Sequence, residues 1–496
     1  MRITKTVYVH SLRCPKLLWL SGWRQDVLAD DTARSEEGNE VGDLAMSYFG
    51  PYYEIPYGCP ETMVKETAQK ICKGVPTICE ASFQVGDLFC SADILRLRAD
   101  GSVDIYEVKS STSIQERQIK DCAFQFYVIS KAGYHINSFN LMHLDGDYIF
   151  DGNQLELEKL FMIEEVTSMI SEKAEEVEAG IARCYGVLSE ETEPESCLSL
   201  ACDKPFDCPA KDYCFKANGI PKESVFSIAG MAAKKKYELF AAGFVTPGQL
   251  RASGRLTESQ LMQIRDMMSV NNEPTINVDG IRQFLSQLRF PIYHLDFETT
   301  QMAIPRYAGM KPYEQCPFQY SLHIMSGKGC NDALEHREFL AVAGQDPRRH
   351  LAEQIVRDIP ADVMTMAYNK RFECSVLKAL AMQFPDLSDG LLAIANNMVD
   401  LMIPFQKRFF TRPCMCGSYS IKAVLPAMCG TDPSIDYHRL PVVHNGIEAM
   451  VTFAGLDKVK DPEEVKRIRE GLLLYCGLDT FAMVRVLQEL FKISEN

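Results

Sequence analysis

Two acidic residues, Asp296 and Glu298, stand two positions apart in the apolar run Pro-Ile-Tyr-His-Leu-Asp-Phe-Glu-Thr-Thr. Such a run is typical of a β-strand, and side chains along a strand alternate between its two faces. Both carboxylates therefore face one way, while Leu295 and Phe297 face into packing. Two neighbouring carboxylates repel each other unless a cation lies between them, and a hard divalent ion prefers oxygen ligands. The pair predicts a site for Mg²⁺ or Mn²⁺.

Further acids follow downstream on expected helices. One segment predicts a strand, then a cap at Asn369, then a helix whose first turn carries Glu373. Near the end of the chain, Tyr475 and Asp479 lie four positions apart and so share one face of another expected helix. Asp400 is a weaker candidate: a helix cap or a residue that supports the ligands is as well indicated as a metal ligand.

This order of residues resembles the DnaQ-like 3′–5′ exonucleases of the RNase H-like fold, over about residues 288–492. In that family four acids hold two metal ions, which clamp the attacking and leaving oxygens of a phosphodiester. The resemblance implies that Tyr475 is a catalytic residue beside the attacking water. It implies that the metal ligands are Asp296, Glu298, Glu373 and Asp479. The family usually has aspartate as its third acid, but the longer Glu373 side chain can still ligate.

A second constellation lies upstream. Asp100 and Gly101 predict a hairpin turn between two strands of alternating pattern. Glu107 and Lys109 share one face of the second strand, and Asp93 is expected at the start of the first. These three side chains can therefore gather on one edge of a sheet.

An aspartate followed by Glu-x-Lys after a hairpin resembles the PD-(D/E)xK nuclease core. The resemblance implies that Asp93 and Glu107 hold a metal ion, while Lys109 orients or activates water and stabilises developing negative charge. The early acid of this fold is expected at Glu40, with an ordinary exposed helix acid as the alternative. Gln125 resembles the glutamine motif that closes the active site in RecB-like enzymes, and it is therefore a third catalytic candidate.

Four cysteines bracket this upstream core: Cys14 precedes it, and Cys202, Cys208 and Cys214 follow it. The arrangement resembles RecB-like nucleases that carry an iron–sulfur cluster, and it implies that four thiolates hold a [4Fe–4S] cluster. The late spacing is wide, so tetrahedral Zn²⁺ remains an alternative, as does a cluster that uses Cys197. Core cysteines without any metal are the third alternative.

The elements that position these residues fall into three segments, because 496 residues are too many for one core. Residues 1–215 are expected to form a PD-(D/E)xK, restriction-endonuclease-like domain. Residues 216–285 are expected to form a helical linker, either like a helix-hairpin-helix or a plain connector. Residues 286–496 alternate strands with helices and are expected to form an RNase H-like exonuclease domain. The predicted fold class is α/β.

Composition sets few limits on function. A net charge of −15 argues against general coating of nucleic acid, although a local basic groove is enough for contact. Residues 406–412 interleave basic and aromatic side chains, which suits either a bound single strand or a solvated turn over buried rings. No stretch has the length of a membrane span and the N-terminus lacks a signal-peptide pattern, so a cytoplasmic protein without membrane contact is expected.

Taken together, the chain resembles a bacterial family that fuses a RecB-like iron–sulfur nuclease to a DnaQ-like exonuclease. We expect a metal-dependent hydrolase of phosphodiester bonds that acts on single-stranded or end-containing DNA in repair, processing or defence. Two alternatives stay open: an RNA exonuclease, and a nucleic-acid-binding scaffold in which one or both sites are inactive.

Overall fold

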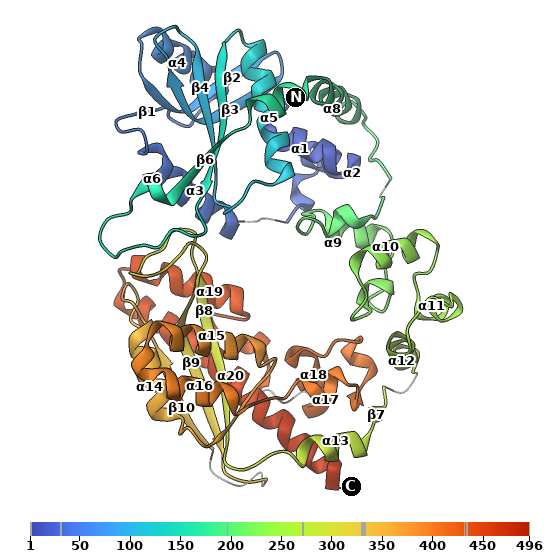
Figure 1. Ribbon diagram of the computed structural model, residues 1–496. Helices are drawn as coiled ribbons and strands as arrows, with labels where there is room; N and C mark the ends of the chain where they lie inside the picture. The colour runs from blue at the N-terminus through green and yellow to red at the C-terminus, as the bar shows by residue number, and fades with distance from the viewer. Residues whose placement is uncertain are drawn as a thin grey trace. The chain divides into compact units, whose positions relative to one another are not determined.

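The computed structural model describes residues 2–29, 32–195, 197–269, 272–328, 334–430, 432 and 435–495. Contacts divide the chain into two compact units. The first comprises Met1–Ile220 with Met302–Glu314, and the second comprises Pro221–Gln301 with Gln315–Asn496. Each unit packs helices against its own β-sheet, which confirms the expected α/β class (Figure 1).

A six-stranded sheet forms the centre of the first unit, in the order β1-β2-β3-β4-β5-β6. Its strands are β1 (Tyr53–Glu54), β2 (Thr77–Val85), β3 (Leu88–Leu97), β4 (Val103–Lys109), β5 (Ile136–Leu144) and β6 (Phe161–Glu165). Strands β2, β3 and β4 are antiparallel neighbours. Strands β4 and β5 are parallel, and the chain between them forms helix α5 (Glu116–Lys131).

Apolar side chains on the two faces of this sheet fill two separate cores. One core joins β4 residues Val103 and Ile105 to helices α1 (Lys5–Arg13), α5 and α8 (Ala174–Leu188). The other core joins Met142 and Leu144 of β5 to helix α3 (Thr32–Met46). The remaining helices of this unit are α2 (Pro15–Trp23), α4 (Pro60–Cys72), α6 (Leu157–Leu160), α7 (Thr167–Ser171) and α9 (Lys211–Ala217). Because Glu107 is in phase with Val103 and Ile105, its side chain meets α1 and α5.

The hairpin predicted at Asp100 and Gly101 is confirmed. Gly101 has a φ of +83°, and the Asp100 carboxylate accepts a hydrogen bond from the Ser102 backbone N–H at 3.0 Å. The expected position of Asp93 was wrong, because this residue lies in the middle of β3. An earlier turn at Gly86, with a φ of +57°, already starts the strand at Leu88.

The second unit has a five-stranded sheet in the order β10-β9-β8-β11-β12. Its strands are β8 (Ile292–Gln301), β9 (Gln315–Met325), β10 (Glu335–Leu340), β11 (Met364–Ala367) and β12 (Met398–Asp400). Strand β8 is antiparallel to β9, which is antiparallel to β10. On its other side β8 is parallel to β11, which is parallel to β12. The strand with the acid pair is therefore central in its sheet.

Helices cover both faces of this second sheet. One core packs Leu295 and Phe297 against α14 (Arg348–Asp358), α15 (Arg371–Gln383) and α16 (Ser388–Asn396). The other core contains α18 (Ile421–Cys429), α19 (Gly446–Gly455) and the long α20 (Pro462–Glu495). Leu295 and Phe297 thus face one core, which leaves Asp296 and Glu298 on the α20 side of the strand, as predicted.

Residues 216–285 are largely helical, as the sequence predicts. They contain the helices α10 (Ala233–Ala241), α11 (Pro247–Ala252), α12 (Glu258–Met267) and α13 (Val278–Leu285) and the short strand β7 (Thr275–Ile276). Strand β7 pairs with β13 (Phe410–Thr411), which follows helix α17 (Ile403–Gln406) in the chain. A small core that includes Leu239, Leu250 and Ile264 holds the first three helices together. Among the described residues, no helix combines the length and the apolar character needed to cross a membrane.

Candidate active sites

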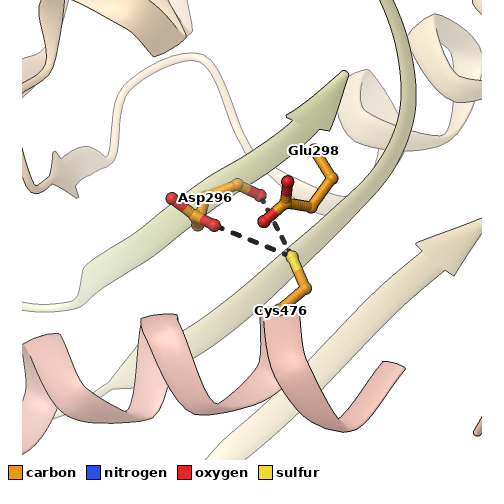
Figure 2. A group of neighbouring side chains, drawn as sticks. All are labelled: Asp296, Glu298 and Cys476. Atoms are coloured by element: carbon orange, nitrogen blue, oxygen red, sulfur yellow. Dashed lines mark hydrogen bonds between the residues drawn. The ribbon is translucent and has the colours of Figure 1, made fainter. Parts of the chain in front are cut away.

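Strand β8 and helix α20 bring one acidic cluster together in the second unit. Asp296 and Glu298 come from β8, and Cys476 comes from α20. Their ligand atoms, a carboxylate oxygen from each acid and the thiol sulfur, all lie within 4.8 Å of one another. Figure 2 shows the Cys476 thiol between the helix and the two carboxylates, with contacts of 3.8 Å to Asp296 Oδ2 and 3.9 Å to the Asp296 carbonyl oxygen.

The charges of this cluster act on one another. Burial, and then the charges of Asp479, Glu298 and Glu373, raise the pKa of Asp296 well above its usual range. Burial and Asp479 likewise raise the pKa of Glu298, against a smaller lowering effect of Lys422. The four acids predicted from the sequence therefore share one electrostatic environment. The Asp296 and Asp479 side chains are partly exposed, so solvent ions can reach them.

Glu373 lies on the first turn of α15, as predicted, and is 2% exposed. Its Oε2 atom has no hydrogen-bond partner in the described part of the chain. Burial and the charge of Asp400 raise the pKa of Glu373 to about 8, against a hydrogen bond from its own backbone. The helix is not capped by Asn369, because its N-cap is Lys370 and Asn369 has a φ of +68°.

Asp400, at the end of β12, holds the backbone next to Glu373. Its Oδ1 accepts hydrogen bonds from the backbone N–H groups of Asn369 at 3.0 Å and Met402 at 2.9 Å. This contact fixes the loop that leads into α15. Asp400 is not the N-cap of either neighbouring helix, since Lys370 is the N-cap of α15 and Met402 that of α17.

Two tyrosines hold Asp479. The Tyr437 hydroxyl donates a hydrogen bond of 2.6 Å to Asp479 Oδ1, and Tyr475 also hydrogen-bonds this carboxylate. The Lys422 ammonium lies 5.1 Å from the Tyr437 ring centroid and 5.5 Å from that of Tyr475. Burial raises the pKa of Asp479, while these hydroxyls and Lys422 oppose the rise. Tyr475 thus contacts the predicted ligand Asp479, and so does Tyr437, which the sequence analysis missed.

The first unit contains the second predicted constellation. Glu107 is 1% exposed, and both of its oxygens are occupied. Oε1 accepts hydrogen bonds from Lys5 at 2.5 Å and Lys109 at 2.8 Å, while Oε2 accepts one from Gln125 at 2.7 Å. Asp93 Oδ2 accepts the backbone N–H of Val108 at 2.6 Å. The structure therefore brings together Asp93, Glu107, Lys109 and Gln125.

The electrostatics of this second group differ from those of the first. Burial alone would raise the pKa of Glu107, but the charges of Lys109 and Lys5 lower it by more, so the net shift is downward. Burial lowers the pKa of Lys109, but the charges of Glu107, Asp121 and Asp93 together raise it by more, so the net shift is upward. Burial and the charge of Glu107 raise the pKa of Asp93. Lys109 also lies 3.3 Å from Asp121, which, like Lys5, the sequence analysis missed.

Glu40 is not brought to this group by any described contact. Its side chain is about half exposed, on helix α3, and its Oε1 lies 3.8 Å from Arg306 in the same unit. The charges that act most on Asp93 and Glu107 come instead from one another, Lys5 and Lys109. The position of Glu40 therefore matches the alternative given for it, an exposed acid on a helix.

The four predicted cysteines line one cavity in the first unit. Cys14 lies between α1 and α2, Cys202 ends the short 3₁₀ helix Leu200–Cys202, Cys208 lies in the loop before α9, and Cys214 lies on α9. The Cys208 backbone N–H donates to the Cys202 carbonyl oxygen at 2.8 Å. Arg13 ties the two ends together, because its guanidinium donates to the carbonyl oxygens of Ala201 at 2.8 Å and Phe206 at 2.6 Å. Cys197 lines the same cavity.

Comparison with known proteins adds one match. A family model described as a domain of unknown function (DUF2779) matches residues 293–420. This range contains Asp296, Glu298 and Glu373 and ends before Asp479. No curated protein and no solved structure matches the chain.

Proposed function

We propose that the chain is a metal-dependent nuclease, and that its acting site is the acidic cluster of the second unit. The observation that carries this proposal is geometric: ligand atoms of Asp296 and Glu298 on β8 and of Cys476 on α20 lie within 4.8 Å of one another. The charges of Asp479 and Glu373 act on both carboxylates and make the site more negative. Buried carboxylates that repel one another are stabilised by a shared divalent cation. The order of the sheet around β8 supports an RNase H-like arrangement, in line with the resemblance to DnaQ-like exonucleases.

The donor set fits Mg²⁺ or Mn²⁺. Asp296, Glu298 and Asp479 offer carboxylate oxygens, and Glu373 offers a buried Oε2 without a hydrogen-bond partner in the described residues. When bound, such ions lower the pKa of water and neutralise charge on the phosphoryl oxygens. The chain's own contribution is positioning: Tyr437 and Tyr475 orient Asp479, and Lys422 supplies a cation beside them for a phosphate.

The cysteine cavity fits an iron–sulfur cluster held by Cys14, Cys202, Cys208 and Cys214. Tetrahedral Zn²⁺ on the same four thiolates is the alternative. In either case the role of the metal group would be structural, because it would join two ends of the first unit.

The first unit is proposed to have a PD-(D/E)xK-like fold, with a weaker case for turnover. Lys5 and Lys109 already neutralise Glu107. This pairing favours the alternative in which the first unit binds nucleic acid without cleaving it. We propose single-stranded or end-containing DNA as the substrate, with RNA as the alternative.

A cleavage assay tests the proposal. The full chain, purified without oxygen, is given single-stranded DNA or RNA labelled at either end, with Mg²⁺, Mn²⁺ or EDTA. We expect Mn²⁺-dependent loss from the 3′ end, lowered about a thousandfold in Asp296→Asn, since metal assistance contributes several kcal/mol and each 1.36 kcal/mol is tenfold.

The matched control is Asp389→Asn, which removes an exposed acid on α16 of the same unit. It should cleave as the unchanged chain does. Lys109→Ala separates the two units, because only activity from the first unit should depend on it. If Asp296→Asn and Asp389→Asn cleave equally, the proposed active site is wrong.

A further inference from the structure

Cys476 occupies a position among the acids that core packing does not explain. It is buried on α20, one residue after Tyr475 and three before Asp479. Its sulfur contacts Asp296 rather than apolar side chains alone, and its ligand atom lies within 4.8 Å of those of Asp296 and Glu298 (Figure 2). A thiol so placed can join the carboxylates in binding one ion.

A second observation points to a ligand near this site. Glu373 is 2% exposed, its Oε2 has no hydrogen-bond partner in the described residues, and its charge acts on both Asp296 and Glu298. Leaving a buried carboxylate oxygen without a partner is costly. A cation within the cluster would satisfy it.

We propose that Cys476 Sγ is a ligand of this metal site and makes it selective for softer divalent ions over Mg²⁺. The inference rests on the metal site proposed above and extends it. Mg²⁺ and Mn²⁺ prefer oxygen ligands, whereas Zn²⁺ and the softer Cd²⁺ accept a mixed set of oxygen and sulfur. On binding, the thiol proton leaves to solvent and the sulfur lone pair bonds to the ion. The site thus accepts Zn²⁺ or Cd²⁺ more readily than a site built of carboxylates alone.

The probe is Cd²⁺, because a Cd²⁺–thiolate bond gives an ultraviolet charge-transfer band. Full-length reduced protein is titrated with Cd²⁺ and, separately, with Mg²⁺, as unchanged chain, Cys476→Ser and Cys476→Ala. Other cysteines contribute equally to all three, so the difference spectrum isolates Cys476. Cys374→Ser is the matched control, since Cys374 lies in the same unit and contacts Ala395 and Met398 instead of the acids.

We expect both Cys476 variants to lose one equivalent of the band. Their Cd²⁺ affinity at this site should fall by about 10- to 100-fold or more. Losing a residue that only supports a metal ligand already costs about that much. Mg²⁺ affinity should stay within about twofold, because Mg²⁺ does not use sulfur. A band and a Cd²⁺ affinity equal to those of Cys374→Ser would overturn the inference and reduce Cys476 to a hydrogen-bond donor to Asp296.

Two further measurements keep the outcome clear. If the Cys476 variants do not fold, ¹¹³Cd NMR of the unchanged chain and of Asp296→Asn decides. The resonance that Asp296→Asn removes belongs to this site, and one thiolate among oxygens moves it downfield of an all-oxygen site. An all-oxygen shift for this ion rejects the inference. Asp296→Asn separates the two proposals: if it abolishes Mn²⁺ binding while Cys476→Ser changes nothing, the metal site stands and the sulfur ligand does not. If Asp296→Asn changes no divalent binding, both fail.

Discussion

Each unit buries one glutamate on a central strand beside a second acid, but the two glutamates have opposite surroundings. Glu107 on β4 is held by Lys5, Lys109 and Gln125, and its pKa is lowered. Glu298 on β8 lies among other acids, and its pKa is raised. In the first unit two lysines form ion pairs with the glutamate, whereas in the second unit the single lysine Lys422 lowers the pKa of Glu298 by less than burial and the neighbouring acids raise it. This difference is why we propose that metal-dependent chemistry occurs in the second unit.

The largest contrast should appear in stability when the two glutamates are neutralised. Glu107→Gln leaves Lys5 and Lys109 without their shared anion, and breaking such a buried pair costs about 3–5 kcal/mol. Glu298→Gln in metal-free protein should cost nothing or stabilise the second unit, because it removes a repelled charge. The two tryptophans, Trp19 and Trp23, lie on α2, so their fluorescence during denaturant unfolding reports on the first unit.

Circular dichroism follows both units in the same samples. Loss of stability in the tryptophan signal for Glu107→Gln, with no loss in the circular dichroism transitions for Glu298→Gln, supports the comparison. An equal loss of stability in both variants would contradict the comparison, because both glutamates would then stabilise the folded chain to the same extent.

Two buried glutamates, Glu373 in the second unit and Glu107 in the first, should contribute to stability with opposite dependence on pH. In EDTA, the folded second unit holds protons on Glu373 between the ordinary glutamate pKa of 4.5 and its raised value of about 8. Its stability is therefore fully present below the lower value and falls by about 1.4 kcal/mol per pH unit for this carboxyl as pH rises through the window. Glu107 has a lowered pKa, so its contribution is present above 4.5 and is lost as pH falls.

Denaturant unfolding in EDTA from about pH 5 to about pH 8 checks this sign. Added Mn²⁺ should remove the downward slope of the second unit, because the ion replaces the protons. A second unit that becomes more stable with rising pH in EDTA contradicts the assignment.

Removing the internal cation of the first unit should make it bind metal better. Lys5→Met frees Glu107 Oε1 from its ion pair and leaves the site more negative. In an Asp296→Asn background, where the second unit is silent, we expect Mn²⁺ affinity at the first unit to rise about tenfold, equal to about 1.4 kcal/mol. Calorimetry measures it, and Lys159→Met, an exposed lysine of the same unit, is the control. Equal Mn²⁺ affinities in Lys5→Met and Lys159→Met would show that Lys5 does not weaken metal binding by the first unit.

The smallest effect concerns the tyrosine that holds Asp479. Tyr437→Phe deletes the hydroxyl that donates to Asp479 Oδ1 and keeps the ring. We expect the Mn²⁺-dependent cleavage rate to fall about tenfold, as for other partners that orient a metal ligand, with little change in stability. Tyr293→Phe, on the opposite face of β8, is the control. Equal rates in both variants would assign Tyr437 to packing alone.

Local patterns in the sequence predicted the parts of both sites that lie on regular elements. The Asp-x-Glu strand, the Asp100-Gly101 hairpin and the helix turn with Glu373 all follow from short-range periodicity and turn chemistry. Asp93 was misplaced because the turn at Gly86 was overlooked, and Asn369 was taken for a cap although its φ is +68°.

The residues that sequence reasoning missed come from distant segments. Lys5 meets Glu107 from 102 positions away, and Tyr437 meets Asp479 from 42 positions away on a short 3₁₀ turn. No local pattern marks either residue, since both contacts depend on how helices pack on the sheet. Cys476 carried one usable signal: it shares a helix with Tyr475 and Asp479 and lies between them in sequence. Asp121 carried another, because it stands four residues before Gln125 on α5.

Titration of metal-free protein with Mn²⁺, followed by electron paramagnetic resonance of the free ion, tests the central claim most directly. The unchanged chain and Asp389→Asn should both bind Mn²⁺, and Asp296→Asn should lose that binding. Equal Mn²⁺ binding by all three proteins, or binding by none, would contradict the claim that the acids of the second unit form a metal site.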